Sequence, residues 1–302
     1  MKKRISLSTG ALQNELGPYK MLEFAKESGL DAVDFELIGQ TVESENSVYS
    51  KSDDEIFEYF DSIRKHAENC GIEIYQTHGR IKAYNYDEEF NELECRSFRC
   101  DCIATKALGA KYCVVHNVHL GLDAPDCDQR KINNRMFDDY MHHAKEHGIV
   151  IAMENLGDTC TPDGRFGVDF FGDKAEFLRS YNEVSSKPGN ADHLCTCVDT
   201  GHINKATRFN TTPPPHEMIL AMGNSVRCLH LNDNDSMTDQ HLVPGAGNID
   251  WQKVLCALRD IGYEGVYNME LDLRRFGNNV ELIKQYTAFS VNVMKELLNK
   301  YL

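Results

Sequence analysis

The chain has no long hydrophobic run. No stretch of about 18 consecutive apolar residues occurs, although a membrane helix needs one. The amino terminus passes from Lys3 and Arg4 into the short run Ile5 to Ser8, which is too short for the apolar region of a signal peptide. The chain has only eight prolines, no low-complexity tract and no Ser/Gly linker. It therefore offers no obvious place at which to divide it into domains. We therefore expect one domain over residues 1–302 that is cytoplasmic and has no membrane partner.

An excess of basic residues is also missing. The chain carries 32 Lys and Arg against 47 Asp and Glu, a formal net charge of -15. Tight binding to a phosphate backbone normally uses a basic stripe, so this balance argues against a nucleic-acid partner. A metal cluster could still supply local positive charge, which leaves nucleic acid open on composition alone.

Cysteine pairs of the C-x-x-C type are absent, which argues against a zinc ribbon or a redox motif. The eleven cysteines are odd in number, and Cys113, Cys197 and Cys228 lie inside apolar runs. A thiol in such a run behaves as a small hydrophobic group. We therefore expect reduced structural thiols.

Eight short apolar runs alternate with amphipathic stretches along the whole chain. The runs predict strands at Ile5–Ser8, Ala32–Leu37, Ile72–Thr77, Tyr112–His116, Ile149–Glu154, Leu194–Asp199, Val226–His230 and Val266–Glu270. Apolar residues at three and four spacing predict helices at Tyr19–Ser28, Asp53–Cys70, Glu88–Leu108, Arg130–His147, Asp173–Val184, Trp251–Ile261 and Val280–Leu298. Helix ends are indicated by Gly29, Gly71, Gly109, Gly148 and Gly262.

The spacing of these elements predicts a closed parallel barrel. Strand ends recur at intervals of roughly 30 to 45 residues, the length of a strand, a helix and two loops. Eight such units in one chain are what a (β/α)8 TIM barrel requires. A doubly wound open sheet is the structural alternative, but it usually has a glycine-rich turn after its first strand. Here Thr9-Gly10-Ala11-Leu12 follows instead.

Six successive strands end at, or just before, a residue type that binds metals. Active sites of such barrels lie at the carboxyl ends of the strands. A buried, unpaired carboxylate there would cost several kcal/mol, and a bound dication removes that cost. Carboxylates with imidazoles suit Zn, Mn, Co or Fe, and Mg is also admitted. These residues are His78, His116, Glu154, Asp199, His230 and Glu270.

Further ligand types lie in two loops. His202 follows Asp199 by three residues, and Asp239 and His241 come after His230. We expect His78, His116, His202, Asp239 and His241 to contact substrate or to hold additional metal ions. His202 has the simpler alternative of orienting Asp199. Arg80, Arg165 and Arg274–Arg275 are either substrate contacts or plain loop charges.

Five motifs carry a family resemblance that covers nearly the full length. They are Met153-Glu154-Asn155, Val198-Asp199-Thr200-Gly201-His202, Leu229-His230-Leu231-Asn232-Asp233, the run from Asp239 to Trp251, and Met269-Glu270-Leu271. The chain resembles the xylose isomerase-like TIM barrel superfamily, which contains sugar phosphate isomerases and epimerases, ketose 3-epimerases, inosose dehydratases and endonuclease IV. In the ketose epimerases the matching residues hold one divalent metal, so the resemblance implies a metal held by Glu154, Asp199, His230 and Glu270.

The expected chemistry is proton transfer on a small sugar or cyclitol. A proton next to a carbonyl is too weakly acidic to leave unaided, and a dication stabilises the resulting enediolate. Glu154 and Glu270 would then serve as the general acid and base on opposite sides of the substrate carbon. Barrels of this group often pair, so a homo-oligomer is a further expectation. One position departs from the epimerases, because Ser236 stands where they carry an arginine.

The competing hypothesis is an endonuclease IV-like phosphodiesterase for abasic DNA. That enzyme holds three zinc ions with nine ligands, and all nine types occur here in order: the four residues of the single-metal site together with His78, His116, His202, Asp239 and His241. The loops after the strands contain few Lys or Arg residues for a DNA backbone, which favours the small-molecule branch. One metal ion is therefore expected, and three under the alternative.

Overall fold

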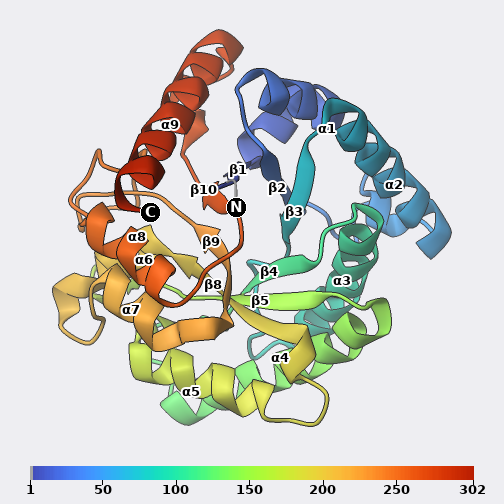
Figure 1. Ribbon diagram of the computed structural model, residues 1–302. Coiled ribbons are helices and arrows are strands. Elements are labelled where there is room, and N and C mark those ends of the chain that lie inside the picture. The colour runs from blue at the N-terminus through green and yellow to red at the C-terminus, as the bar shows by residue number, and fades with distance from the viewer. Residues whose placement is uncertain (1–2) are drawn as a thin grey trace.

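The computed structural model describes residues 3–302, which form a (β/α)8 barrel with helices outside a ring of parallel strands (Figure 1). Residues 1–2 of the expected domain lie outside the described range. The barrel strands are β1 (Ile5–Ser8), β2 (Ala32–Glu36), β3 (Glu73–His78), β4 (Tyr112–His116), β5 (Val150–Glu154), β8 (Leu194–Asp199), β9 (Val226–His230) and β10 (Tyr267–Met269). All eight predicted strands are confirmed to within one residue at each end.

Neighbouring strands are paired in parallel in the order β10-β1-β2-β3-β4-β5-β8-β9. The ring closes where Leu231, just beyond β9, bridges to Met269 of β10. The Leu231 amide donates to the Asn268 carbonyl at 2.8 Å, and the Glu270 amide donates to the Leu231 carbonyl at 3.1 Å. The barrel is therefore nearly closed, with its shortest pairing between β9 and β10.

The helices cover the outside of the ring, and the predicted ones are confirmed apart from their ends. Gly29, Gly71, Gly109, Gly148 and Gly262 all take positive φ next to helix ends, as the sequence indicated. The helices are α1 (Gly10–Glu27), α2 (Asp53–Cys70), α3 (Glu88–Ala107), α4 (Asp126–His147), α5 (Lys174–Ser185), α6 (Thr200–Ala206), α7 (Pro215–Met222), α8 (Trp251–Asp260) and α9 (Val280–Tyr301). No helix within residues 3–302 is both long and apolar enough to cross a membrane.

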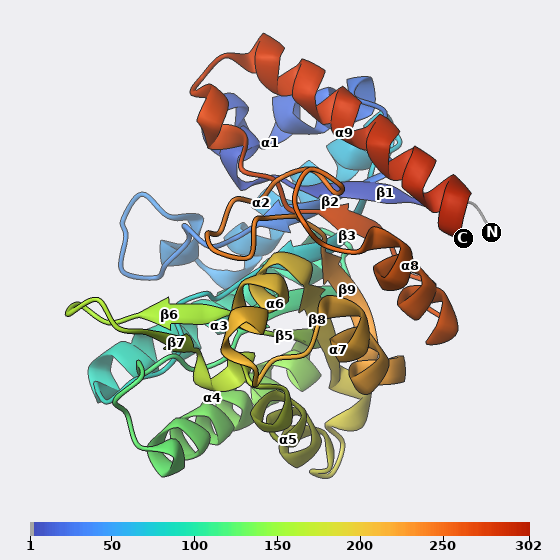
Figure 2. The same cartoon turned by 90° about the vertical axis from the view of Figure 1, so that its left-hand side faces the viewer.

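Five helices and strands differ from the sequence prediction or were absent from it. Helix α1 begins at Gly10 instead of Tyr19, with a break at Gly17 (φ 73°) before Pro18. The short helices α6 and α7 were not predicted. A two-stranded hairpin of β6 (Asp158–Cys160) and β7 (Phe166–Val168) was also missed, and it projects away from the barrel (Figure 2).

The core has two parts on the two sides of the sheet. One large cluster packs the strands against the surrounding helices. A smaller cluster joins Val114, Ala152, Cys195, Cys197 and Cys228, which alternate along their strands with residues of the large cluster. All eleven cysteines are free thiols, and the three in this inner cluster are buried, in agreement with the expected structural thiols.

The long connection from β9 to α8 is organised by one buried carboxylate, that of Asp233. Its Oδ1 accepts from the amides of Asn234 at 2.9 Å and Ile249 at 3.2 Å. Its Oδ2 accepts from the Gly245 amide at 2.9 Å and the Trp251 indole at 2.8 Å. Because Asp233 is fully buried, these four bonds fix the loop that carries Asp239 and His241.

Replacing Asp233 by Asn should destabilise the protein. Either orientation of the amide points its NH2 group at two N–H donors, which leaves buried groups unsatisfied. We expect the free energy of unfolding to fall by about 2–3 kcal/mol in a urea titration. The matched control is Asp260→Asn, because Asp260 is exposed and pairs with its neighbour Arg259; it should change stability by less than about 0.5 kcal/mol. Equal stability of the two variants would contradict this role.

Candidate metal centre at the barrel mouth

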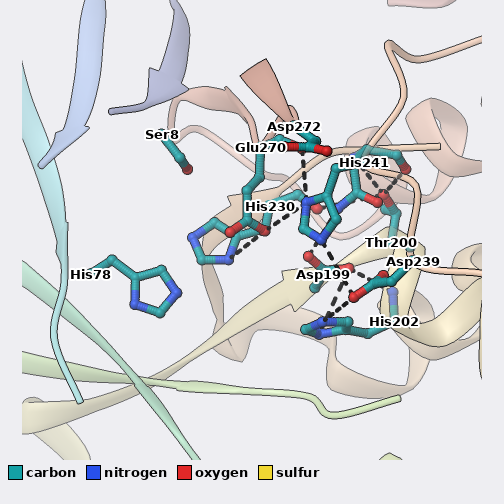
Figure 3. A network of polar contacts seen from close by, with 12 residues as sticks. Ser8, His78, Asp199, Thr200, His202, His230, Asp239, His241, Glu270 and Asp272 are labelled. Carbon is teal, nitrogen blue, oxygen red and sulfur yellow. Dashed lines mark hydrogen bonds and ion pairs between the residues drawn. The ribbon is translucent and has the colours of Figure 1, made fainter. Parts of the chain in front are cut away.

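Four buried or half-buried candidate metal ligands meet at the carboxyl ends of four strands. Glu154, Asp199 and His230 end β5, β8 and β9, and Glu270 follows β10. Each offers one donor atom, and these four atoms all lie within 4.8 Å of one another. The strand registers produce this level arrangement, since Asp199 is the direct partner of His230. Figure 3 shows Asp199, His230 and Glu270 converging from their separate strands.

The distances at His230 show how these groups face one another. Its Nδ1 lies 2.9 Å from Glu154 Oε1 and 3.6 Å from Glu270 Oε2. Glu154 is 1% exposed, and its Oε2 is buried without a hydrogen-bond partner among the described residues. Three carboxylates around one imidazole are costly to bury without a cation. The donor set therefore fits a divalent metal ion, with oxygen and nitrogen ligands.

A carboxylate that the sequence did not single out, Asp34, holds the other side of His230. Asp34 lies within β2 and is fully buried. Its Oδ2 is 3.0 Å from His230 Nε2 and also accepts from Gln76 and Ser8, each at 3.1 Å. This contact engages Nε2, so Nδ1 is the ring nitrogen that would bind an ion in the ligand cluster.

The outer candidates surround the same centre. Glu154 Oε2 lies 3.6 Å from His78 Nε2 and 3.3 Å from His116 Nε2. On the other side His202, Asp239 and His241 form a second group of ligand types (Figure 3). Asp239 Oδ2 lies 3.8 Å from His202 Nε2 and 3.5 Å from His241 Nε2. All nine residues named from the sequence are thus brought to one mouth.

Two roles were open for His202, and both are compatible with its contacts. Its backbone amide donates to Asp199 Oδ1 at 2.6 Å, which caps helix α6 and orients that carboxylate. Its ring lies between the two ligand groups, with Nδ1 3.2 Å from the Asn155 carbonyl and 3.7 Å from Glu154 Oε1.

Burial and neighbouring charges shift the pKa values of Glu154 and Glu270 in opposite directions. Although burial acts in the opposite direction, His230 and His116 hold the pKa of Glu154 well below its usual range. Burial raises the pKa of Glu270 to about 7. Burial also lowers the pKa of His78 to about 4, against the pull of Glu154. In the protein without metal, Glu154 is therefore ionised while Glu270 titrates near neutrality.

Two of the arginines named from the sequence, Arg80 and Arg165, are engaged elsewhere. Arg80 is 4% exposed and bonds the carbonyls of Leu37, Ile38 and Gln40 as well as Asp101. Arg165 lies on the β6–β7 connection and pairs with Asp123 and Asp163. Arg80 therefore anchors the loop after β2, and Arg165 is a paired surface charge.

Two cavities flank the centre. The larger, of about 640 Å³, lies between the loops after β1, β2 and β10 and includes Glu270 and His241 in its wall. The smaller, of about 240 Å³, is lined by His116, His202 and Asp239. Ile81 borders both cavities. The ligand cluster is therefore reached by space of the size that small-molecule sites use.

Comparisons with known proteins agree with this architecture. The family model described as xylose isomerase-like TIM barrel matches residues 22–291. Among solved structures, a D-tagatose 3-epimerase-like protein superposes with a TM-score of 0.72 at 22% identity, covering 99% of this chain and 98% of its own. The IolI protein with a bound zinc atom gives a TM-score of 0.72 at 19% identity, with 99% of each chain covered. At these identities the likeness shows the fold.

Curated relatives match in sequence over part of the chain. Fructoselysine 3-epimerase of Escherichia coli O157:H7 is 25% identical over 123 residues, which are 39% of this chain and 44% of the relative. The chain spans about half the length of the curated relatives that it matches. The family model, by contrast, covers most of the described barrel and includes all four strands that deliver the candidate metal ligands, β5, β8, β9 and β10. The chain belongs to the xylose isomerase-like TIM barrel family.

Proposed function

We propose that the protein is a divalent metal-dependent isomerase or epimerase of small sugars or cyclitols. The observation that carries this proposal is the meeting of Glu154, Asp199, His230 and Glu270 at the barrel mouth. A relative is named as a sugar epimerase, and one structural neighbour is named with a bound zinc atom, which supports both the reaction class and a metal. The proposed setting is the cytoplasm, and the chain is proposed to form a homo-oligomer.

The four ligands would hold one Zn, Mn, Co or Mg ion, which when bound stabilises negative charge on the substrate's carbonyl and hydroxyl oxygens. Glu154 reaches the centre from β5, and Glu270 reaches it from the end of β10. On one side of the ring, four other strands lie between β5 and β10. One carboxylate can therefore take a proton from the carbon beside the carbonyl while the other returns a proton from the opposite side. Such a transfer through an enediolate inverts or isomerises the sugar.

Asp34, Asp199 and Asn232 position these groups. Asp34 sets the tautomer of His230, and Asn232 Nδ2 donates to Asp199 Oδ2 at 2.9 Å. Because each of these side chains is fully buried, they cannot reorient toward solvent. This supports a centre whose geometry exists before substrate binds, which lowers the reorganisation needed for catalysis.

A second candidate function is favoured by the separate group of His202, Asp239 and His241. This group could hold an additional ion, and His78 with His116 could complete another beside Glu154. Three ions would match the endonuclease IV-like reaction on abasic DNA. The Lys205 side chain in this region pairs with Asp158 at 2.9 Å, which leaves little positive charge for a DNA backbone.

Counting metal ions separates the two functions. The purified chain, loaded with zinc and dialysed, should hold about one ion, as measured by elemental analysis. The variant Asp199→Ala should lose that ion, whereas Asp239→Ala should retain it, since Asp239 lies outside the four-residue group. About three ions per chain, together with incision of a duplex containing an abasic site, would replace the isomerase proposal by the phosphodiesterase.

Replacing Asp34 by Asn should weaken metal binding about 10- to 100-fold, because the amide no longer fixes the proton on His230 Nε2. The measurement is a competition titration of Zn²⁺ against a chelator. Asp31→Asn near the start of the same strand, outside the ligand cluster, serves as the matched control and should bind zinc with unchanged affinity. Unchanged affinity in Asp34→Asn would show that Asp34 only packs the barrel.

Replacing Glu270 by Gln should slow proton transfer about 10²- to 10⁴-fold, because the amide cannot act as a base. The readout is uptake of deuterium from solvent into candidate ketoses and inososes, with the metal content of each sample measured alongside. Glu264→Gln, an exposed glutamate close in sequence, is the control. Deuterium uptake that survives in a metal-loaded Glu270→Gln sample would exclude Glu270 as an acid or base.

A further inference from the structure

The larger cavity beside the metal centre extends well beyond the ligands. Its wall runs from Glu270 and His241 to Gly10 at the start of α1 and to Glu36 at the end of β2. A volume of about 640 Å³ falls within the range of about 300 to 1,000 Å³ that drug-sized ligands occupy. A sugar bound at the metal ligands would therefore leave part of this cavity for a substituent.

Glu36 is held rigidly in the wall of that cavity. In the sheet it is the direct partner of His78, so it lies at the level of the metal ligands. The Gln13 side chain accepts from the Glu36 amide at 2.8 Å and donates to its carbonyl at 3.1 Å. The carboxylate lies against the backbone of Gly10, where a Cβ would come within 2.8 Å of Glu36 Oε2. Glycine at this position leaves room for the carboxylate.

Glu36 takes part in no ion pair among residues 3–302. The charged groups around it are the carboxylates of Asp34 and Glu270 and the imidazole of His230. A positive group in the cavity would stabilise its ionised form.

The cations that line the two cavities are already paired. Arg274 lies 3.0 Å from Asp272, and Lys205 lies 2.9 Å from Asp158. Glu15, on the outer part of the larger cavity, is a further carboxylate without an ion pair among the described residues. The side of this cavity formed by β2 and α1 is therefore negative, and a phosphate group placed there would meet carboxylates.

We propose that the cavity at Glu36 is a subsite for a protonated amine, so that the substrate is an unphosphorylated sugar that carries an amino substituent distant from its carbonyl. This inference rests on the proposed sugar chemistry at the metal centre. Glu36 would form a charge-assisted hydrogen bond with the ammonium group, and Glu15 would add to the attraction from the rim. The carbonyl end of the same sugar would face Glu154 and Glu270.

Three matched probes test the subsite: D-fructose, 6-amino-6-deoxy-D-fructose and D-fructose 6-phosphate, titrated into the zinc-loaded protein by calorimetry. We expect the amino sugar to bind at least about tenfold more tightly than D-fructose, and the phosphate more weakly than either. The variant Glu36→Gln keeps the shape of the side chain and should remove the preference for the amine while binding D-fructose as before. Glu296→Gln, an exposed glutamate on α9, should keep the preference.

Several results would overturn the inference. Equal binding of the amino sugar and D-fructose by the natural protein, tighter binding of the phosphate, or binding of none of the probes would each do so, and none depends on how a variant folds. An equal loss of both sugars in Glu36→Gln would show a contact with sugar hydroxyls instead. A preference for the amine without deuterium uptake by any probe would keep the subsite and refute the isomerase proposal.

Discussion

The barrel mouth depends on one buried imidazole, that of His230, held between two carboxylates. Asp34 binds one ring nitrogen at 3.0 Å and Glu154 approaches the other at 2.9 Å. All three side chains are almost fully buried, so neither carboxylate can exchange its partner for water. This arrangement ties β2, β5 and β9 together across the ring, and it fixes the nitrogen that points toward Asp199 and Glu270. The other candidate ligands are arranged around this fixed group.

Much of the fold follows from the sequence because the signals are local. Apolar runs of four to six residues predict buried parallel strands, and glycines such as Gly71 and Gly148 end the helices in left-handed conformation. Helix α7 was missed because Pro213, Pro214 and Pro215 resemble a loop, although Pro215 occupies the first helical turn. The β6–β7 hairpin has strands of only three residues, too short for any periodicity.

The candidate site, like the fold, could be predicted from the sequence only where the signals are local. Ligands at strand ends could be found from the sequence, because a charged residue that ends an apolar run is conspicuous there. Asp34 was missed because it lies inside its strand, where an isolated acid gives no indication of the histidine it meets almost 200 positions later. The burial of Arg80 was also invisible, since its partners come from two other segments. Contacts between distant segments depend on the barrel closing, which no local pattern encodes.

The seam of the barrel, between β9 and β10, lies beside the candidate metal centre. Pairing between β9 and β10 consists of a single bridge at Leu231 and Met269, flanked by His230 on one strand and Glu270 after the other. An ion bound by His230 and Glu270 would therefore link β9 and β10, the two neighbouring strands with the shortest backbone pairing. Binding of the ion and closure of the ring would then be one coupled event, so the amides of Leu231 and Glu270 would be sensitive reporters of both.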